Sequence, residues 1–264
     1  MNFTAMHPFP ARQDLNVPLE RGRPFVQYKN RVLAALSPAT LLAMQPRLLS
    51  IELPQGEVLH EPGRNMTCGY FLESGIIAHQ AVMANGRAIS VSLIGPEGFA
   101  GYAGVAGIGR ESLRLVVQVP SRAQRIAIDD LRRLISTNSH LQALLLRGLQ
   151  LQYLHSAQTA ACNSVHDVPG RLARWILTVQ DHMILGQSTS DGVLPLTHEL
   201  LSEMLGASRS TVSLSAETLK RAGLISYTRG NIHVADRKGL EKSACECYEF
   251  GRSLLNEYLT QRLA

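Results

Sequence analysis

Between about residues 48 and 128 the chain carries short apolar or alternating runs separated by turn residues. LLSIEL, YFLESGIIAHQAVM, AISVSLI and LRLVVQV are four such runs. Asn85-Gly86 lies between the second and the third, and it favours a tight hairpin because both residues tolerate positive φ. Many short strands with frequent turns and no intervening helical pattern predict an antiparallel β-roll of the jelly-roll or double-stranded β-helix type.

A helical pattern replaces this alternation from about His140 to Cys162. Its apolar face is broad and comprises Leu141, Leu144, Leu145, Leu149, Leu151 and Leu154, continued by three alanines. We expect one edge of this helix to pack on the β-roll and the other on a second copy of the chain. Packing on its own domain alone is the simpler alternative.

The stretch LTHELLSEMLGASRSTVSLSAETLKRAGLI, residues 196–225, contains two short helical patterns joined at a glycine. Thr197 is suited to cap the first helix, Gly206 to end it, and Ser208 to cap the second. Two helices with a tight glycine turn predict a helix-turn-helix. LISYTRGNIHVAD then alternates around Arg229-Gly230-Asn231, which predicts a hairpin and therefore a winged motif.

The outward residues of the second helix are short or flexible, which suits a helix that enters a DNA groove about 12 Å wide. Arg209 is the one long cation at its start and suits guanine or a phosphate. An ordinary helical hairpin with a solvated serine face is the alternative. We predict that DNA is contacted by Thr197, Ser208, Arg209, Ser210, Thr211, Ser213, Arg229 and Asn231.

These patterns divide the chain into five segments, with a break near NSVHDVPG, where Asp167 can cap a new helix. We expect an α+β protein with a flexible extension over 1–27, a β-roll with flanking helices over 28–137, a dimerisation helix over 138–164, a winged helix-turn-helix over 165–238 and a C-terminal helix over 239–264.

Composition agrees with a globular protein. The chain has 264 residues, is 45% hydrophobic and 18% charged, and has a formal net charge of +5, which suits an anionic partner. No signal-peptide core or membrane-spanning run is visible, and four scattered cysteines do not form a disulfide framework. We expect a cytoplasmic protein with no membrane partner.

The order of motifs resembles the Crp–Fnr family of bacterial transcription regulators. LPQGEVLHEPG, YFLESG and GPEGFAG resemble its cyclic-nucleotide-binding roll, DVPGRLARWIL its hinge and first DNA-domain helix, and residues 196–225 its helix-turn-helix. The resemblance covers roughly residues 30–238. It implies a homodimer, joined by the long helix, that binds two half-sites on double-stranded DNA about one helical turn apart.

The effector region departs from that family pattern. Members that bind cyclic AMP carry a glutamate for the ribose and an arginine for the phosphate, whereas here Tyr102 and Ser112 occupy these places. Arg110 or Arg114 could replace the arginine after a slip of two residues. We expect an effector other than cyclic AMP, or none, and its candidate pocket residues are Phe99, Gly101, Tyr102 and Ser112.

No metal or cofactor is expected. No cysteine precedes Cys68, which argues against the N-terminal iron–sulfur centre of oxygen-sensing relatives. Cys245 and Cys247 fall in the expected C-terminal helix, where residues two apart point about 200° from each other and cannot share an ion. A metal or haem site that uses one of the scattered histidines is a weaker alternative; these are His60, His79, His155 and His166.

Catalytic patterns are also missing from the sequence. We find no local Ser-His-Asp or paired-carboxylate signature, so we do not expect an enzyme. The alternative is a β-roll enzyme, or a metal- or haem-dependent sensor, whose helical hairpin is only structural. The C-terminal helix is expected to pack on the DNA domain, and RNA polymerase is a further candidate partner.

Overall fold

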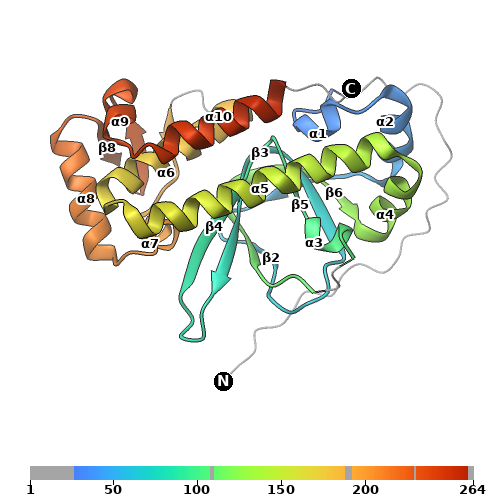
Figure 1. Cartoon of the computed structure of the whole chain (residues 1–264), viewed down its shortest axis with the longest axis horizontal. Helices are drawn as coiled ribbons and strands as arrows, with labels where there is room; N and C mark the ends of the chain where they lie inside the picture. The colour runs from blue at the N-terminus through green and yellow to red at the C-terminus, as the bar shows by residue number, and fades with distance from the viewer. Residues whose placement is uncertain (1–26, 108–109, 188–191, 229, 261–264) are drawn as a thin grey trace.

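The computed structural model describes residues 27–107, 110–187, 192–228 and 230–260. A β-roll occupies one end of the molecule and a helical domain with a small sheet the other, and one long helix spans both (Figure 1). Arg229, predicted above to contact DNA, lies outside the described residues.

The roll is an antiparallel sheet, as the alternating runs predict. Its strands pair in the order β1-β6-β3-β4, with β2 added to β6 and β5 added to β3. Asn85 and Gly86 form the turn between β3 and β4, as expected. The strands are β1 (Leu49–Leu53), β2 (Val58–His60), β3 (Cys68–Val82), β4 (Ala88–Ile94), β5 (Phe99–Ala100) and β6 (Arg114–Ala127).

Short helices precede, interrupt and follow the strands of the roll along the chain. Asn30 caps the first of them, because its Oδ1 accepts from the amides of Val32 and Leu33 while its own side-chain amide donates to the carbonyls of Leu72 and Gly98. The flanking elements are α1 (Arg31–Ala34), α2 (Pro38–Met44), the 3-10 turn η1 (Gln45–Arg47), α3 (Tyr102–Val105) and α4 (Ile128–Thr137).

The long helix α5 (Ser139–Val165) has 27 residues and is capped by Asn138, whose side chain accepts from the Leu141 amide. Leu144 and Leu151 face the protein interior, each 7% exposed. A different set of apolar side chains on this helix faces outward: Leu146, Leu149 and Tyr153 are 57%, 38% and 69% exposed.

The second domain begins at α6 (Val168–Leu185), which Asp167 caps as predicted through a hydrogen bond from the Gly170 amide. Its other elements are β7 (Val193–Leu194), α7 (His198–Leu205), α8 (Arg209–Arg221), β8 (Ile225–Thr228), β9 (Asn231–Val234) and α9 (Arg237–Ser243). Roll residues such as Ile76 and Leu93 share one buried cluster with Trp175 and Ile176 of α6. The two domains are therefore packed against each other.

The expectation of a single C-terminal helix over 239–264 is wrong. The backbone leaves the helix after Ser243, because Ala244 is extended (φ −74°, ψ 150°). A second helix, α10 (Cys247–Thr260), begins after three non-helical residues. This helix lies along α5 as well as α6, so it packs on more than the DNA domain (Figure 1). Among the described residues, no helix is long and apolar enough to cross a membrane.

Candidate nucleic-acid interface

Local hydrogen bonds build the two-helix unit of α7 and α8. The Thr197 hydroxyl accepts from the Leu200 amide (3.2 Å), and the Ser208 hydroxyl accepts from the Thr211 amide (3.2 Å). Gly206 ends α7 in the left-handed conformation (φ +61°), which a residue with a side chain rarely adopts. All three residues take the local roles that the sequence predicts.

Helix α8 has one buried face and one exposed face, which is polar at its N-terminal end and carries Leu214 farther along. Val212, Ser215, Ala216 and Leu219 pack inward. Ser208, Arg209, Ser210 and Thr211 are exposed at the N-terminal end. Unpaired backbone N–H groups and hydroxyls at a helix N-terminus form a favourable site for phosphate, and short side chains there let the helix approach base edges.

Two residues of α7 that the sequence reasoning missed contact this face. Glu199 forms an ion pair with the Arg209 guanidinium. His198 Nδ1 lies 2.9 Å from the Ser213 hydroxyl, so Ser213 is half-buried and already engaged. Their position in the first turn of α7, across the glycine turn from α8, is the signal that could have identified them.

The wing is the β8–β9 hairpin, in the small sheet of order β7-β9-β8. Asn231 opens β9 opposite Thr228. Gly230 at the tip has φ +84°, and a Cβ there would lie 3.4 Å from Thr197 Cγ2, so the tip sits beside the start of α7. The wing and the helix pair therefore present neighbouring surfaces.

The effector candidates separate into two groups. Phe99, Gly101 and Tyr102 lie together: the Tyr102 ring packs edge-on against Phe99 at 5.4 Å between centroids, and Gly101 has φ +145°. The Tyr102 hydroxyl is buried without a hydrogen bond and meets Gly148 of α5. Ser112 is instead exposed in the turn before β6, where its amide donates to the Glu111 carboxylate (2.8 Å).

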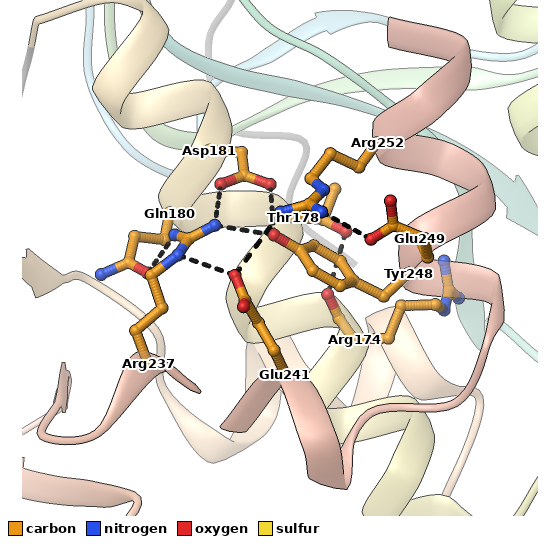
Figure 2. A network of polar contacts seen from close by, with 9 residues as sticks. All are labelled: Arg174, Thr178, Gln180, Asp181, Arg237, Glu241, Tyr248, Glu249 and Arg252. Atoms are coloured by element: carbon orange, nitrogen blue, oxygen red, sulfur yellow. Dashed lines mark hydrogen bonds and ion pairs between the residues drawn. The ribbon is translucent and has the colours of Figure 1, made fainter. Parts of the chain in front are cut away.

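A network of polar contacts fixes α9 and α10 to α6 (Figure 2). The Arg237 guanidinium donates to Gln180 Oε1 (2.6 Å), to Asp181 Oδ1 (2.7 Å) and to the Tyr248 hydroxyl (2.7 Å). The Tyr248 hydroxyl donates in turn to Asp181 Oδ2 (2.9 Å). Since each helix contributes at least one partner, the three helices hold a defined relative position.

Among the described residues, polar contacts also join the roll to α7 and to the segment just before it. Gln80 Nε2 donates to Glu203 Oε2 of α7 (2.8 Å), and an Arg87 Nη donates to the Gly206 carbonyl (3.4 Å). Gln55 Nε2 donates to the Pro195 carbonyl (3.1 Å). The position of α7 is thus set partly by the β3–β4 hairpin of the roll.

A β-roll packed on a winged helix-turn-helix, with a polar helix end exposed, defines a DNA-binding transcriptional regulator. Comparison with known families agrees. Residues 50–138 match the family model of the cyclic nucleotide-binding domain, and residues 170–243 match that of the Crp-like helix-turn-helix domain. The chain belongs to the Crp–Fnr family of transcriptional regulators.

Similar proteins include the CRP-like cAMP-activated global transcriptional regulator of Mycobacterium tuberculosis (strain CDC 1551 / Oshkosh), 23% identical over 81% of this chain and 96% of the relative. The global nitrogen regulator of Nostoc sp. (strain PCC 7120) is 26% identical, and the aligned region covers 66% of this chain and 79% of the relative. A crystal structure of a CRP-family regulator from Thermus thermophilus has TM-score 0.62 and 18% identity, covering 74% of this chain and 96% of that one, and it shares the fold.

Proposed function

We propose that this regulator acts as a homodimer on a two-fold operator, with α8 of each copy in a major groove. The exposed polar N-terminal end of α8 is the observation that carries the proposal. Ser208, Ser210 and Thr211 would meet phosphates or base edges, and Arg209 would bind guanine or a phosphate. Thr197 and Asn231 would contact the backbone from the start of α7 and from the wing.

Ser213 and Arg209 have conditional roles in this proposal. Ser213 is bonded to His198, so it would contribute to DNA binding by holding the two helices in register. Arg209 is paired with Glu199, and both side chains are largely exposed, at 68% and 50%. An exposed pair of this kind is worth at most about 1 kcal/mol, so DNA can displace the carboxylate.

The outward face of α5 supports the homodimer. Leu146, Leu149 and Tyr153 follow one another at steps of three and four residues and are exposed in a single copy. Ala157 and Ala160 extend this surface toward the end of the helix. An apolar stripe at this spacing is the surface that a parallel copy of the same helix covers.

We propose further that the protein is not an enzyme and that cyclic AMP is not its effector. Phe71 and Phe99 are fully buried inside the roll, with 4.5 Å between their ring centroids. Arg114, one candidate for a shifted phosphate ligand, is paired with Glu61 at 3.1 Å. Aromatic rings therefore fill this part of the roll, and Arg114 is already engaged.

The test is a gel-shift titration on the DNA upstream of the protein's own gene, at several salt concentrations. Arg209→Ala should weaken binding by about 1–3 kcal/mol and relax preference at one base position. Arg221→Ala is the matched control, since Arg221 is an exposed arginine at the other end of α8, paired with Glu217. If both variants lost the same amount of DNA affinity, or if Arg209→Ala lost none, the assignment of α8 as the recognition helix would be contradicted.

A further inference from the structure

Four metal-binding side chains meet where α5 ends. Cys162 lies in the last turn of α5 and His166 directly follows the helix, whereas Cys245 lies in the α9–α10 connection and Cys247 begins α10. Their ligand atoms all lie within 4.8 Å of one another. We expected no metal partly because Cys245 and Cys247 would point in different directions within one helix. The helix ends before Ala244, so this argument does not apply to the structure.

We propose that Cys162, His166, Cys245 and Cys247 form a mononuclear zinc site that fixes the DNA-binding domain to the end of α5. Bonds of about 2.3 Å to sulfur and about 2.0–2.1 Å to nitrogen place tetrahedral ligands about 3.6–3.8 Å apart. The Cys162 and Cys245 sulfurs are 3.6 Å apart, and Cys247 Sγ is 3.5 Å from His166 Nδ1. These atoms are already near the spacing that one ion requires.

Partners outside the four ligands orient them as they do in metal sites. His166 presents Nδ1 to the cluster while its Nε2 lies 3.0 Å from Glu246 Oε1. A carboxylate on the far nitrogen of a ligating histidine fixes the ring and its tautomer. Gln158 Nε2 donates to Cys247 Sγ (2.9 Å), so this sulfur is held by a partner outside the cluster as well.

A buried cation balances the charge of the proposed site. Three thiolates, a neutral imidazole and Zn²⁺ carry a net charge of −1. Arg174 of α6 is 6% exposed, and its Nε and Nη2 are buried without a hydrogen-bond partner. Arg174 lines the same cavity as Cys247, beside the cluster. The guanidinium lies over the Trp175 ring, 4.4 Å from its centroid, but a ring does not neutralise the charge, so a nearby anion would lower the cost of burying it.

The connection that carries Cys245 is held against the start of α6. The Cys245 amide donates to the Gly170 carbonyl (3.3 Å), and a Cβ at Gly170 would lie 2.9 Å from Asp167 Oδ1 and 3.5 Å from the Cys245 nitrogen. Together with the Arg237–Asp181–Tyr248 network (Figure 2), this contact positions the late cysteines before any ion binds. A pre-formed ligand set lowers the entropy cost of binding the ion.

Two other chemistries fit less well. An iron–sulfur cluster contains several irons and sulfides, and so needs its protein ligands farther apart than a single ion does. A Cys162–Cys245 disulfide would use two of the thiols, but it gives no role to Cys247, to the His166–Glu246 pair or to Arg174. One tetrahedral ion uses all of these groups.

The experiment measures metal in the full-length chain, purified under reducing conditions from cells supplied with zinc. We expect one Zn²⁺ per chain by elemental analysis. Co²⁺ added to metal-free protein should give intense thiolate-to-cobalt absorption and the visible bands of a tetrahedral ion. The zinc affinity of Cys245→Ser, measured by competition with a chelating dye, should be more than about 100-fold lower than that of the wild type. Removing a residue that hydrogen-bonds a ligand lowers metal affinity by about 10–100-fold, and removing a ligand itself should cost more. The zinc affinity of Glu246→Gln should be about 10–100-fold lower than that of the wild type, because Glu246 holds the ligand His166.

Cys68→Ser is the matched control, because Cys68 is a half-buried thiol on β3 outside the cluster, and it should retain the wild-type zinc content. Circular dichroism verifies that each variant is folded. Folded, reduced wild-type protein that neither carries zinc nor gives the cobalt spectrum would overturn the proposal. So would unchanged affinity in Cys245→Ser, or a Cys162–Cys245 disulfide as the resting state. None of these measurements involves DNA, so their outcome is independent of the operator test.

Discussion

The carboxylate of Glu97 and the imidazole of His182 form an ion pair between the β-roll and α6, with 3.0 Å between Oε2 and Nδ1. Both side chains are almost fully buried, at 5% and 2% exposed. The Gly95 amide donates to the other carboxylate oxygen (2.8 Å), and the Tyr258 hydroxyl of α10 donates to the Glu97 carbonyl (3.2 Å). One turn of the roll is thereby tied to both α6 and α10.

This pair predicts a pH dependence of stability. Burial opposes both charges, but attraction and hydrogen bonding within the pair outweigh it, so the pKa of Glu97 is lowered below 4.5 and the pKa of His182 is raised above 6.5. The contribution of His182 is complete below pH 6.5 and is lost as pH rises through its folded pKa. The contribution of Glu97 is complete above pH 4.5 and is lost as pH falls through its folded pKa. The pair should therefore stabilise the fold most between these two values.

Urea unfolding of wild type and Glu97→Gln across this pH range checks the prediction. Loss of one partner of a buried pair costs about 3–5 kcal/mol, and we expect less here because His182 can release its proton. The difference between the two proteins should shrink above pH 6.5. A constant difference at every pH would show that Glu97 acts by packing alone.

A second prediction concerns the face of α5 that we propose joins two copies. Leu146→Glu together with Tyr153→Glu should convert a dimer to a monomer in sedimentation, because the seam would bury unpaired charges. Leu42→Glu, at a leucine of α2 that is 63% exposed, is the control and should remain dimeric. Wild-type protein that is monomeric at micromolar concentration would contradict the proposed homodimer.

The close contact of Gly148 with Tyr102 gives a third prediction. A Cβ at residue 148 would clash with the Tyr102 hydroxyl oxygen. Gly148→Ala should therefore destabilise the protein by about 1–3 kcal/mol, despite the roughly 1 kcal/mol that alanine gains over glycine in a helix. The measurement is urea unfolding, repeated in the Tyr102→Phe background, where most of the loss should disappear.

Gly251→Ala provides the matched control for this prediction. Gly251 lies in α10 with nothing within 4 Å of a built Cβ, so alanine there should stabilise the protein by up to about 1 kcal/mol. If both glycine variants stabilised the protein equally, Tyr102 would have room to move and would not be fixed against α5.

The fourth prediction is that cyclic AMP does not act as the effector. Titration calorimetry with cyclic AMP should show no saturable heat up to millimolar ligand, and operator affinity should not change, since a switching ligand must bind the two states differently. The exposed Ser112 cannot neutralise a cyclic phosphate. A micromolar dissociation constant would mean that Arg110 or Arg114 has taken over the phosphate.

Many elements of this protein could be predicted from its sequence because local hydrogen bonds and backbone preferences determine them. Asp167, Thr197 and Ser208 each bond a backbone amide within three residues, so the starts of α6, α7 and α8 depend on neighbours along the chain. The hairpin at Asn85-Gly86 and the end of α7 at Gly206 follow equally from local conformational preference. The roll, the long helix and the winged motif were predictable for this reason.

Tertiary structure decided which surfaces meet. Periodicity shows that α5 is apolar on several sides, but only the packed molecule shows that Leu144 and Leu151 are buried while Leu146 and Tyr153 remain exposed. The same is true of Glu97 and His182, which lie 85 residues apart. The break after Ser243 brings Cys245 and Cys247 to the end of α5, with Cys245 83 residues beyond Cys162. Such contacts depend on how whole helices pack against one another, and this packing cannot be inferred from a local pattern of residues.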